Sequence, residues 1–442
     1  MNTQEDLSGY RGEALEALRK AGAKIGDVLR ILKNSQTYEG ILIPRSEYGD
    51  RQHIVIKLKN GYNIGIKVTQ NTQMKRMGEG SKPIFTSEPL PKQNLSLPRA
   101  AIISTGGTIA SRVDYRTGAV RPALSATDLY SVVPELAEIA KIDARILLSL
   151  FSENIMPNHW TQIAKAIADC ISQGVDGVVV AHGTDTMGYT AAALSFALQE
   201  LPVPVIVVGS QRSADRPSSD AAANLVGAVT AAARAPFAEV AVAMHETTSD
   251  QSILLHRGTK VRKCHTSRRD TFRSVNSPPL ARIRNHTITM LTDEYIRRDP
   301  ARSIVVKPEF KEKVALVKFF PGMDPETIRW YQSRHYKGLI IEGTGLGHVS
   351  NTCFEPIQDA VDSGIVVAMT SQCIWGRVNM NVYDQGRDLQ ALGVIPLEDM
   401  LPETAIVKLM WVLGQTDDRR RAQELLKTNI AGELTRRTLL DE

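Results

Sequence analysis

The 442-residue chain has only four cysteines and no long apolar run. Its cysteines, at positions 170, 264, 353 and 373, are far apart and form no Cys-x-x-Cys pair, which excludes a dense disulfide framework and indicates reduced thiols. Its apolar stretches are far shorter than the ~20 residues that a membrane helix needs, which excludes a membrane-spanning protein. The first residues lack a basic segment followed by an apolar one, so we expect no signal peptide and a cytoplasmic location.

Two classes of ligand-binding motif are also missing. The chain has no Gly-x-x-x-x-Gly-Lys-[Ser/Thr] loop, so we expect no ATP site in it. Its nine histidines form no His-Glu-x-x-His motif and no histidine–cysteine set at zinc spacing, which argues against a bound metal. We therefore expect no cofactor in this chain.

Positive charge is concentrated at the front of the chain. Residues 1–100 contain 16 Lys and Arg against 10 Asp and Glu, a net charge of +6, while the remaining residues carry −1. A basic segment can bind nucleic acid, because phosphate contacts supply most sequence-independent affinity. A solvated basic surface explains the same excess at least as well.

The length exceeds the roughly 250–300 residues at which a single hydrophobic core stops growing, so the chain has two or three domains. A short amphipathic helix at 12–21 is followed by brief apolar runs and turn-formers, which predict a small antiparallel β-barrel over residues 1–80. Residues 81–99 are rich in proline, serine and lysine and predict a linker.

From residue 100 onward, apolar runs alternate with alanine-rich helical stretches, which is typical of parallel strands joined by crossover helices. We expect a larger α/β domain with the active site over 100–295 and a smaller α/β domain over 310–442. The Arg-rich stretch 282–306 predicts irregular structure, and 424–442 predicts a charged terminal helix pair.

Two threonines follow small residues at the ends of apolar strands. Thr108 lies in Thr-Gly-Gly-Thr-Ile-Ala (105–110) and Thr184 lies in His-Gly-Thr-Asp-Thr (182–186). Ligands of open α/β sheets bind at the carboxyl ends of strands, where glycines let a substrate approach the backbone. Because a threonine hydroxyl needs a second group to take its proton, the two loops together predict a catalytic site.

These motifs resemble those of the bacterial-type L-asparaginases and glutaminase-asparaginases, which carry both sequences about seventy to eighty residues apart. The resemblance covers residues 100 to about 415 and includes Gly-Ser-Gln-Arg (209–212) and Phe-Pro-Gly-Met (320–323). It implies an asparaginase-like body of two α/β domains, no metal, and hydrolysis of a side-chain amide by two-step acyl transfer.

The resemblance also implies roles for individual residues. Thr108 is the nucleophile, Tyr115 lies on a mobile loop that closes over it, and Thr184, Asp185 and Lys263 form a second triad. A partly desolvated lysine among polar partners can accept a proton. Whether Tyr115 or the Thr184–Lys263 pair deprotonates Thr108 is left open.

Ser152 and Glu153 match the loop that holds the substrate carboxylate in the family. The substrate implied is an α-amino acid amide, glutamine or asparagine. A turn made by Ser152 for purely structural reasons is the alternative.

The N-terminal module changes the expected purpose of the site. A small barrel, a linker and an asparaginase-like body together resemble the asparaginase-like subunits of archaeal glutamyl-tRNA(Gln) amidotransferases. The resemblance implies a glutaminase that forms a homodimer through its body and a heterotetramer with a partner, the amidotransferase E subunit. This partner would use the ammonia, ATP and Mg²⁺ to amidate Glu-tRNA(Gln).

Two other functions are compatible with the sequence. The chain could be a stand-alone cytoplasmic L-asparaginase with an appended barrel, or a non-catalytic RNA-binding scaffold. The barrel itself could contact RNA or only the partner protein. Its few candidate stacking residues, Tyr38, Tyr48 and Tyr62, favour contact with protein.

Overall fold

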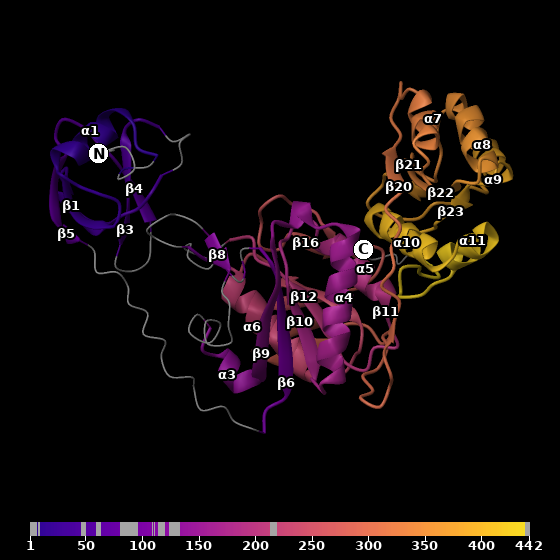
Figure 1. Cartoon of the computed structure of the whole chain (residues 1–442), viewed down its shortest axis with the longest axis horizontal. Helices are drawn as coiled ribbons and strands as arrows, with labels where there is room; N and C mark the ends of the chain where they lie inside the picture. Colours follow the sequence, from indigo (N-terminus) through magenta and orange to yellow (C-terminus); the bar gives the residue numbers. More distant parts are fainter. Residues whose placement is uncertain are drawn as a thin grey trace.

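The computed structural model describes residues 7, 9–45, 50–58, 63–79, 96–107, 109, 111–113, 120–122, 133–212 and 219–437. Figure 1 shows the helices and strands along the chain. An antiparallel five-stranded sheet precedes two α/β units, each built on a sheet with parallel strands. The predicted fold class, an asparaginase-like α/β body behind a small antiparallel β domain, is confirmed.

The N-terminal sheet consists of short strands that bury one face. Its elements are α1 (Gly12–Lys20), β1 (Asp27–Lys33), β2 (Gln36–Leu42), β3 (His53–Leu58), β4 (Asn63–Lys67) and β5 (Gln73–Glu79). The strands pair antiparallel in the order β4-β3-β2-β1-β5. Leu29 and Ile31 of β1 alternate with exposed residues and pack in one core with Leu18 of α1, because successive strand side chains point to opposite faces.

Strand β5 lies in a stretch whose sequence has no apolar periodicity. Its side chains are exposed or half-buried, so no alternating pattern marks it. An ion pair between Arg76 and the buried Asp27 (2.6 Å) ties it to β1. In the described pairing, β4 and β5 stand at opposite ends of the sheet, so its hydrogen bonds do not close into a ring.

The larger α/β unit contains an eight-stranded sheet in the order β18-β17-β14-β13-β12-β10-β6-β9. Five neighbouring strands are parallel: β13 (Val240–His245), β12 (Val205–Val208), β10 (Gly177–Ala181), β6 (Arg99–Gly106) and β9 (Lys141–Leu150). The antiparallel strands β14 (Ile253–Arg257), β17 (Ala281–Arg284) and β18 (Thr287–Met290) extend one edge.

Helices cover both faces of this sheet, which explains its nearly continuous apolar strands. One face packs against α3 (Leu136–Ile139) and α6 (Ala221–Arg234), and the other against α4 (Pro157–Ser172) and α5 (Met187–Ala197) (Figure 1). In β6, Ala100 and Ile102 face the first pair, and Ala101 and Ile103 face the second.

The smaller unit is a four-stranded parallel sheet in the order β20-β21-β22-β23. Its elements are β20 (Val314–Lys318), α7 (Glu326–Ser333), β21 (Gly338–Gly343), η4 (Asn351–Cys353), α8 (Phe354–Asp362), β22 (Val366–Ser371), α9 (Asp384–Ala391), β23 (Ile395–Pro396), α10 (Pro402–Gln415) and α11 (Arg419–Lys427). Helix α10 joins the two units, because Trp411 stacks on Phe196 of α5 with ring centroids 5.9 Å apart.

Two predictions of local structure are wrong. The stretch 282–306 contains the β17–β18 hairpin and β19 (Val305–Val306), which pairs with β11 (Leu198–Gln199). It looked irregular because the hairpin lies at a sheet edge, where arginines occupy the solvent face. The predicted terminal helix pair is absent from the described residues of 424–442, where α11 ends at Lys427 and residues 428–437 form no helix.

Four short strands and one 3-10 helix are the remaining elements of the described residues. Strands β7 (Ser111–Val113) and β8 (Val120–Pro122) pair with each other, as do β15 (Val261–Lys263) and β16 (Phe272–Ser274), and η3 spans Ser152–Asn154. No helix within the described ranges is long and apolar enough to cross a bilayer.

Candidate active site

Four loops meet at one edge of the larger sheet. They follow the neighbouring parallel strands β12, β10, β6 and β9, and therefore leave the sheet at the carboxyl ends of its strands. The two threonine motifs follow β6 and β10. A hydrogen bond from Thr105 Oγ1 to the Ala181 carbonyl oxygen (3.0 Å) joins the strand ends from which these motifs depart.

Glycines allow these loops to touch. Gly107 has φ +81°, and a Cβ at this position would lie 2.7 Å from the Gly183 nitrogen. A Cβ on Gly183 would in turn lie 2.8 Å from the Ser152 Cβ. Because Gly107 and Gly183 have no side chain, the two threonine loops and Ser152 can approach one another this closely.

Lys263 connects the second threonine motif to the β15–β16 hairpin. Its Nζ donates to Thr184 Oγ1 (2.9 Å) and to Asp185 Oδ1 (2.8 Å). The Thr184 residue is buried, whereas the Asp185 side chain is 69% exposed and that of Lys263 is 15% exposed. The structure thus brings together three predicted site residues that come from positions almost 80 residues apart.

This arrangement suits proton transfer. An amine within hydrogen-bond reach of a hydroxyl can take the proton of that hydroxyl or return it, which is the geometry required of a general base. The exposed carboxylate of Asp185 is able to contact both the lysine and a solvent-borne cationic group. An α-amino group of a substrate is such a group.

The buried side chain of His182 stabilises the second threonine motif through hydrogen bonds. Its Nδ1 lies 2.7 Å from the Gly183 carbonyl oxygen, which can only accept, so Nδ1 carries the proton and Nε2 accepts from the Thr190 hydroxyl (2.9 Å). Trp160 Nε1 donates to the same hydroxyl (3.1 Å). Complete burial lowers the pKa of His182 to about 4, so the ring is neutral at pH 7. The motif contains this histidine, but only burial identifies its supporting role.

Ser152 lies next to the second threonine loop, whereas Glu153 is exposed. Ser152 is buried at the start of η3, against Gly183, and its carbonyl oxygen accepts from Thr186 Oγ1 (2.7 Å). The side chain of Glu153 is exposed. Of this predicted pair, Ser152 is therefore the residue that the fold places at the loop junction.

The loop after β12 is held by a buried carboxylate. Asp220, just before α6, accepts from the backbone nitrogens of Gln211 and Arg212, each at 3.0 Å, and from Asn224 Nδ2 at 3.0 Å. A Cβ on Gly209 would lie 2.8 Å from Thr184 Cγ2, so this loop packs directly on the second motif. The family resemblance covers Gly-Ser-Gln-Arg (209–212) and also Asp220, in Arg-Pro-Ser-Ser-Asp (216–220), but only the structure shows that Asp220 anchors this loop.

Thr108 and Tyr115 lie outside the described residues, so their predicted roles stay predictions. Within the described part of the chain, no cluster of three or more His, Cys, Asp or Glu side chains is arranged to hold a metal ion.

Comparison with known families first identifies the class of protein to which the chain is similar. Residues 99–295 match the family model "Asparaginase, N-terminal", and residues 313–426 match "Glutaminase/Asparaginase C-terminal domain". The L-asparaginase of Thermococcus kodakarensis has a TM-score of 0.70 and 33% identity, with 76% of this chain and 99% of that chain covered. L-asparaginase I of Vibrio cholerae has a TM-score of 0.68 and 30% identity, with coverages of 77% and 100%. The fold and the loops thus define an amidohydrolase of the asparaginase class.

The N-terminal residues narrow this class. Residues 23–75 match the family model "GatD N-terminal domain". The glutamyl-tRNA(Gln) amidotransferase D subunit of Methanopyrus kandleri is 53% identical over 436 residues, covering 97% of this chain and 95% of that protein. The protein of the same name from Pyrococcus furiosus is 52% identical over 428 residues, with coverages of 95% and 97%. The chain belongs to the family of glutamyl-tRNA(Gln) amidotransferase D subunits.

Proposed function

We propose that the chain is the glutaminase subunit of a tRNA-dependent amidotransferase. It hydrolyses glutamine and supplies ammonia to a partner protein that converts Glu-tRNA(Gln) to Gln-tRNA(Gln). The observation that carries this function is the extent of the similarity: about half of the residues are identical over nearly the whole chain, N-terminal sheet included. The matched L-asparaginase structures cover only about three quarters of it.

The proposed reaction has two steps on Thr108. In the first, the hydroxyl oxygen of Thr108 bonds to the carbonyl carbon of the side-chain amide, the C–N bond breaks, and the nitrogen leaves with a proton as ammonia. In the second, water attacks the resulting ester, releases glutamate and returns the proton to Thr108. Backbone N–H groups near Thr184 are the candidate donors to the oxyanion.

The other site residues are proposed to position the substrate and move protons. Lys263 takes and returns a proton through the Thr184 hydroxyl, to which it is already hydrogen-bonded at 2.9 Å. Asp185 holds the α-amino group of the substrate, and Ser152 binds its carboxylate. Tyr115 is assigned to the loop that closes over the bound amide.

The proposed partner proteins follow from how the ammonia is used. Ammonia is useful only if it reaches the activated tRNA before it escapes to solvent, so we propose a stable interface with a second protein, the amidotransferase E subunit. ATP and Mg²⁺ are assigned to that partner. A homodimer through the asparaginase-like body and a cytoplasmic location are part of the same proposal.

The test is a rate measurement on glutamine and asparagine with the purified chain. We expect slow hydrolysis by the chain alone and a large increase when the E subunit and Glu-tRNA(Gln) are added. The Thr108→Ala variant should lose glutaminase activity in the complete mixture while its circular dichroism spectrum stays unchanged. Full activity of the Thr108→Ala variant would show that Thr108 is not the nucleophile.

A stand-alone L-asparaginase is the second candidate, because the matched L-asparaginase structures are covered over 99% and 100% of their length. It predicts that the isolated chain hydrolyses asparagine at its maximal rate. If the E subunit and Glu-tRNA(Gln) leave that rate unchanged, the amidotransferase function is wrong.

A further inference from the structure

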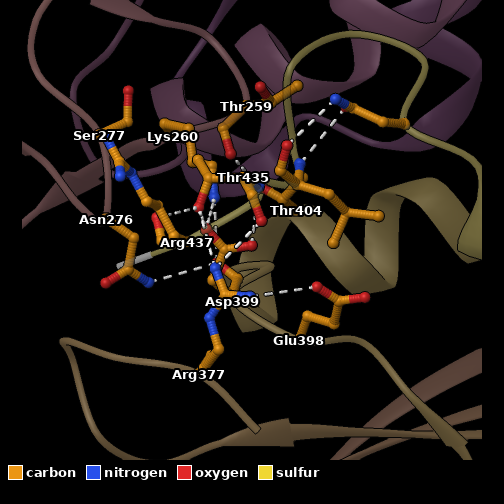
Figure 2. Close-up of polar contacts among 12 residues, drawn as sticks. Thr259, Lys260, Asn276, Ser277, Arg377, Glu398, Asp399, Thr404, Thr435 and Arg437 are labelled. Carbon is orange, nitrogen blue, oxygen red and sulfur yellow. Dashed lines mark hydrogen bonds and ion pairs between the residues drawn. The ribbon is translucent and has the colours of Figure 1, made fainter. Parts of the chain in front are cut away.

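A buried polar cluster joins three distant segments outside the candidate active site (Figure 2). Lys260 precedes β15, Asp399 lies between β23 and α10, and Thr435 lies in the segment after α11. The side chains of Lys260 and Asp399 are both fully buried. Burying two charges is costly unless their hydrogen bonds are complete, so the environment of this pair is informative.

The Asp399 residue receives donors from each of the other segments. Lys260 Nζ donates to Asp399 Oδ2 (2.8 Å) and to its carbonyl oxygen (3.1 Å). The backbone nitrogen of Thr435 donates to Asp399 Oδ1 (3.0 Å), and the Thr435 hydroxyl donates to Oδ2. Burial lowers the pKa of Lys260, and the carboxylate of Asp399 acts in the opposite direction.

A second tie holds the other strand of the same hairpin. Asn276 follows β16 by two residues, with φ +58°, and its Nδ2 donates to the carbonyl oxygens of Gly376 (2.9 Å) and Asp399 (3.3 Å). The Gly376 nitrogen donates back to Asn276 Oδ1 (2.8 Å). Hydrogen bonds to loops of the smaller unit therefore hold the β15–β16 hairpin at the base of both strands.

The outer end of this hairpin carries Lys263. Lys263 follows Lys260 by three residues, or about 10 Å along an extended strand. It pairs with Phe272 across the hairpin, and Phe272 is buried in the core. The hairpin has only three residue pairs, so Lys263 is connected by a short ladder to the base that the Asp399 cluster holds.

We infer that Asp399 and Thr435 are positioning residues that hold the Lys263 hairpin against Thr184. The inference rests on the proposed role of Lys263 in glutamine hydrolysis. It gives the segment after α11 a part in catalysis, because Thr435 supplies two of the donors that orient the Asp399 carboxylate. Both residues act through the hairpin and not on the substrate.

Thr435 is the better position to perturb. Asp399→Asn would leave the buried charge of Lys260 without its counterion and would destabilise the whole joint. Thr435→Val keeps the shape and the backbone donor and removes only the hydroxyl, and Thr435→Ser restores the hydroxyl. Thr428→Val is the matched control, because the Thr428 hydroxyl donates to the Glu424 carbonyl oxygen (2.8 Å) in the same segment, away from the hairpin.

The experiment measures glutaminase kcat and KM of the full chain, assembled with its partner protein and Glu-tRNA(Gln), over a range of pH. Small misplacement of a catalytic group lowers kcat steeply, so we expect Thr435→Val to lower kcat about tenfold, with KM within about twofold of wild type. The acidic limb of the pH profile, on which a general base loses its proton, should shift as well. Thr435→Ser and Thr428→Val should match wild type in both respects.

Three outcomes overturn the inference: unchanged kcat in Thr435→Val, failure of Thr435→Ser to restore kcat, or an equal loss of kcat in Thr428→Val. Failure of the proposed function has a separate signature. In that case the wild-type complex does not hydrolyse glutamine, or Thr108→Ala retains full activity, whatever the Thr435 variants do.

Discussion

Replacing Lys263 with methionine removes the ammonium group and keeps a similar side-chain length. In the structure that group donates to Thr184 Oγ1 (2.9 Å) and Asp185 Oδ1 (2.8 Å). A positioned acid or base contributes roughly 10²–10⁴-fold to a reaction rate, which corresponds to about 3–5 kcal/mol of activation free energy. We therefore expect Lys263→Met to lower kcat by a factor in that range.

The same substitution should barely change the free energy of unfolding. The Asp185 side chain is 69% exposed, so water solvates its carboxylate when the lysine is gone. Ion pairs of this kind stabilise a protein by about 0–1 kcal/mol. Lys260→Met, three residues earlier on the same hairpin, is the matched control. It leaves the buried Asp399 carboxylate without its lysine, a change that costs about 3–5 kcal/mol.

The assay pairs kcat of the assembled glutaminase with urea unfolding of each variant. Lys263→Met should lower kcat while the free energy of unfolding stays near the wild-type value. Lys260→Met should lower the free energy of unfolding. The reasoning is refuted if Lys263→Met retains kcat within tenfold of wild type. It is also refuted if Lys263→Met destabilises the chain as much as Lys260→Met does.

Three further predictions concern stability, pH and the N-terminal sheet. Glu433→Gln should lower the free energy of unfolding by about 3–5 kcal/mol, because the Lys408–Glu433 pair (2.5 Å) is fully buried. Lys408→Met combined with Glu433→Leu should recover only part of that loss in urea unfolding, because Glu433 also accepts from backbone nitrogens and Lys408 also donates to backbone carbonyl oxygens. Burial lowers the pKa of His182 from 6.5 to about 4, so its contribution to stability is present above pH 6.5 and is lost as the pH falls towards 4. A urea midpoint that stays flat over that window contradicts this prediction. If the N-terminal sheet binds tRNA, charge reversal of the exposed Lys67 and Lys75 should reduce the salt dependence of tRNA affinity, whereas an unchanged slope indicates contact with protein alone.

Much of the fold was predictable because its signals are local. Apolar runs alternating with alanine-rich stretches indicated parallel strands and crossover helices, and the eight-stranded and four-stranded sheets have both. The glycines of both threonine motifs were predicted to let a substrate approach the backbone; in the structure Gly107 and Gly183 let the two loops themselves approach each other. Strand β5 was not predictable, because its exposed side chains lack an apolar period. The β17–β18 hairpin was missed although its apolar residues do alternate, because polar and arginine side chains occupy the intervening positions.

The supporting residues of the site were harder to predict. His182 and Asp220 act through burial and through backbone partners, and neither property is visible in a linear motif. The sequence also contains nothing that marks Thr435, since its partner Asp399 lies 36 residues away in a different loop.

Lys260, just before strand β15, and Lys263, at its end, show what the sequence determined and what the tertiary structure determined. The amino-acid sequence alone determined that threonine loops end two strands of an α/β sheet and that several basic residues lie near position 263. Only the tertiary structure decided that Lys260 is buried against Asp399, 139 residues away, while Lys263 reaches Thr184, 79 residues away. The physical reason is that strand pairing and domain packing bring these partners together, and the environment of each lysine then sets whether it stabilises the fold or faces the site.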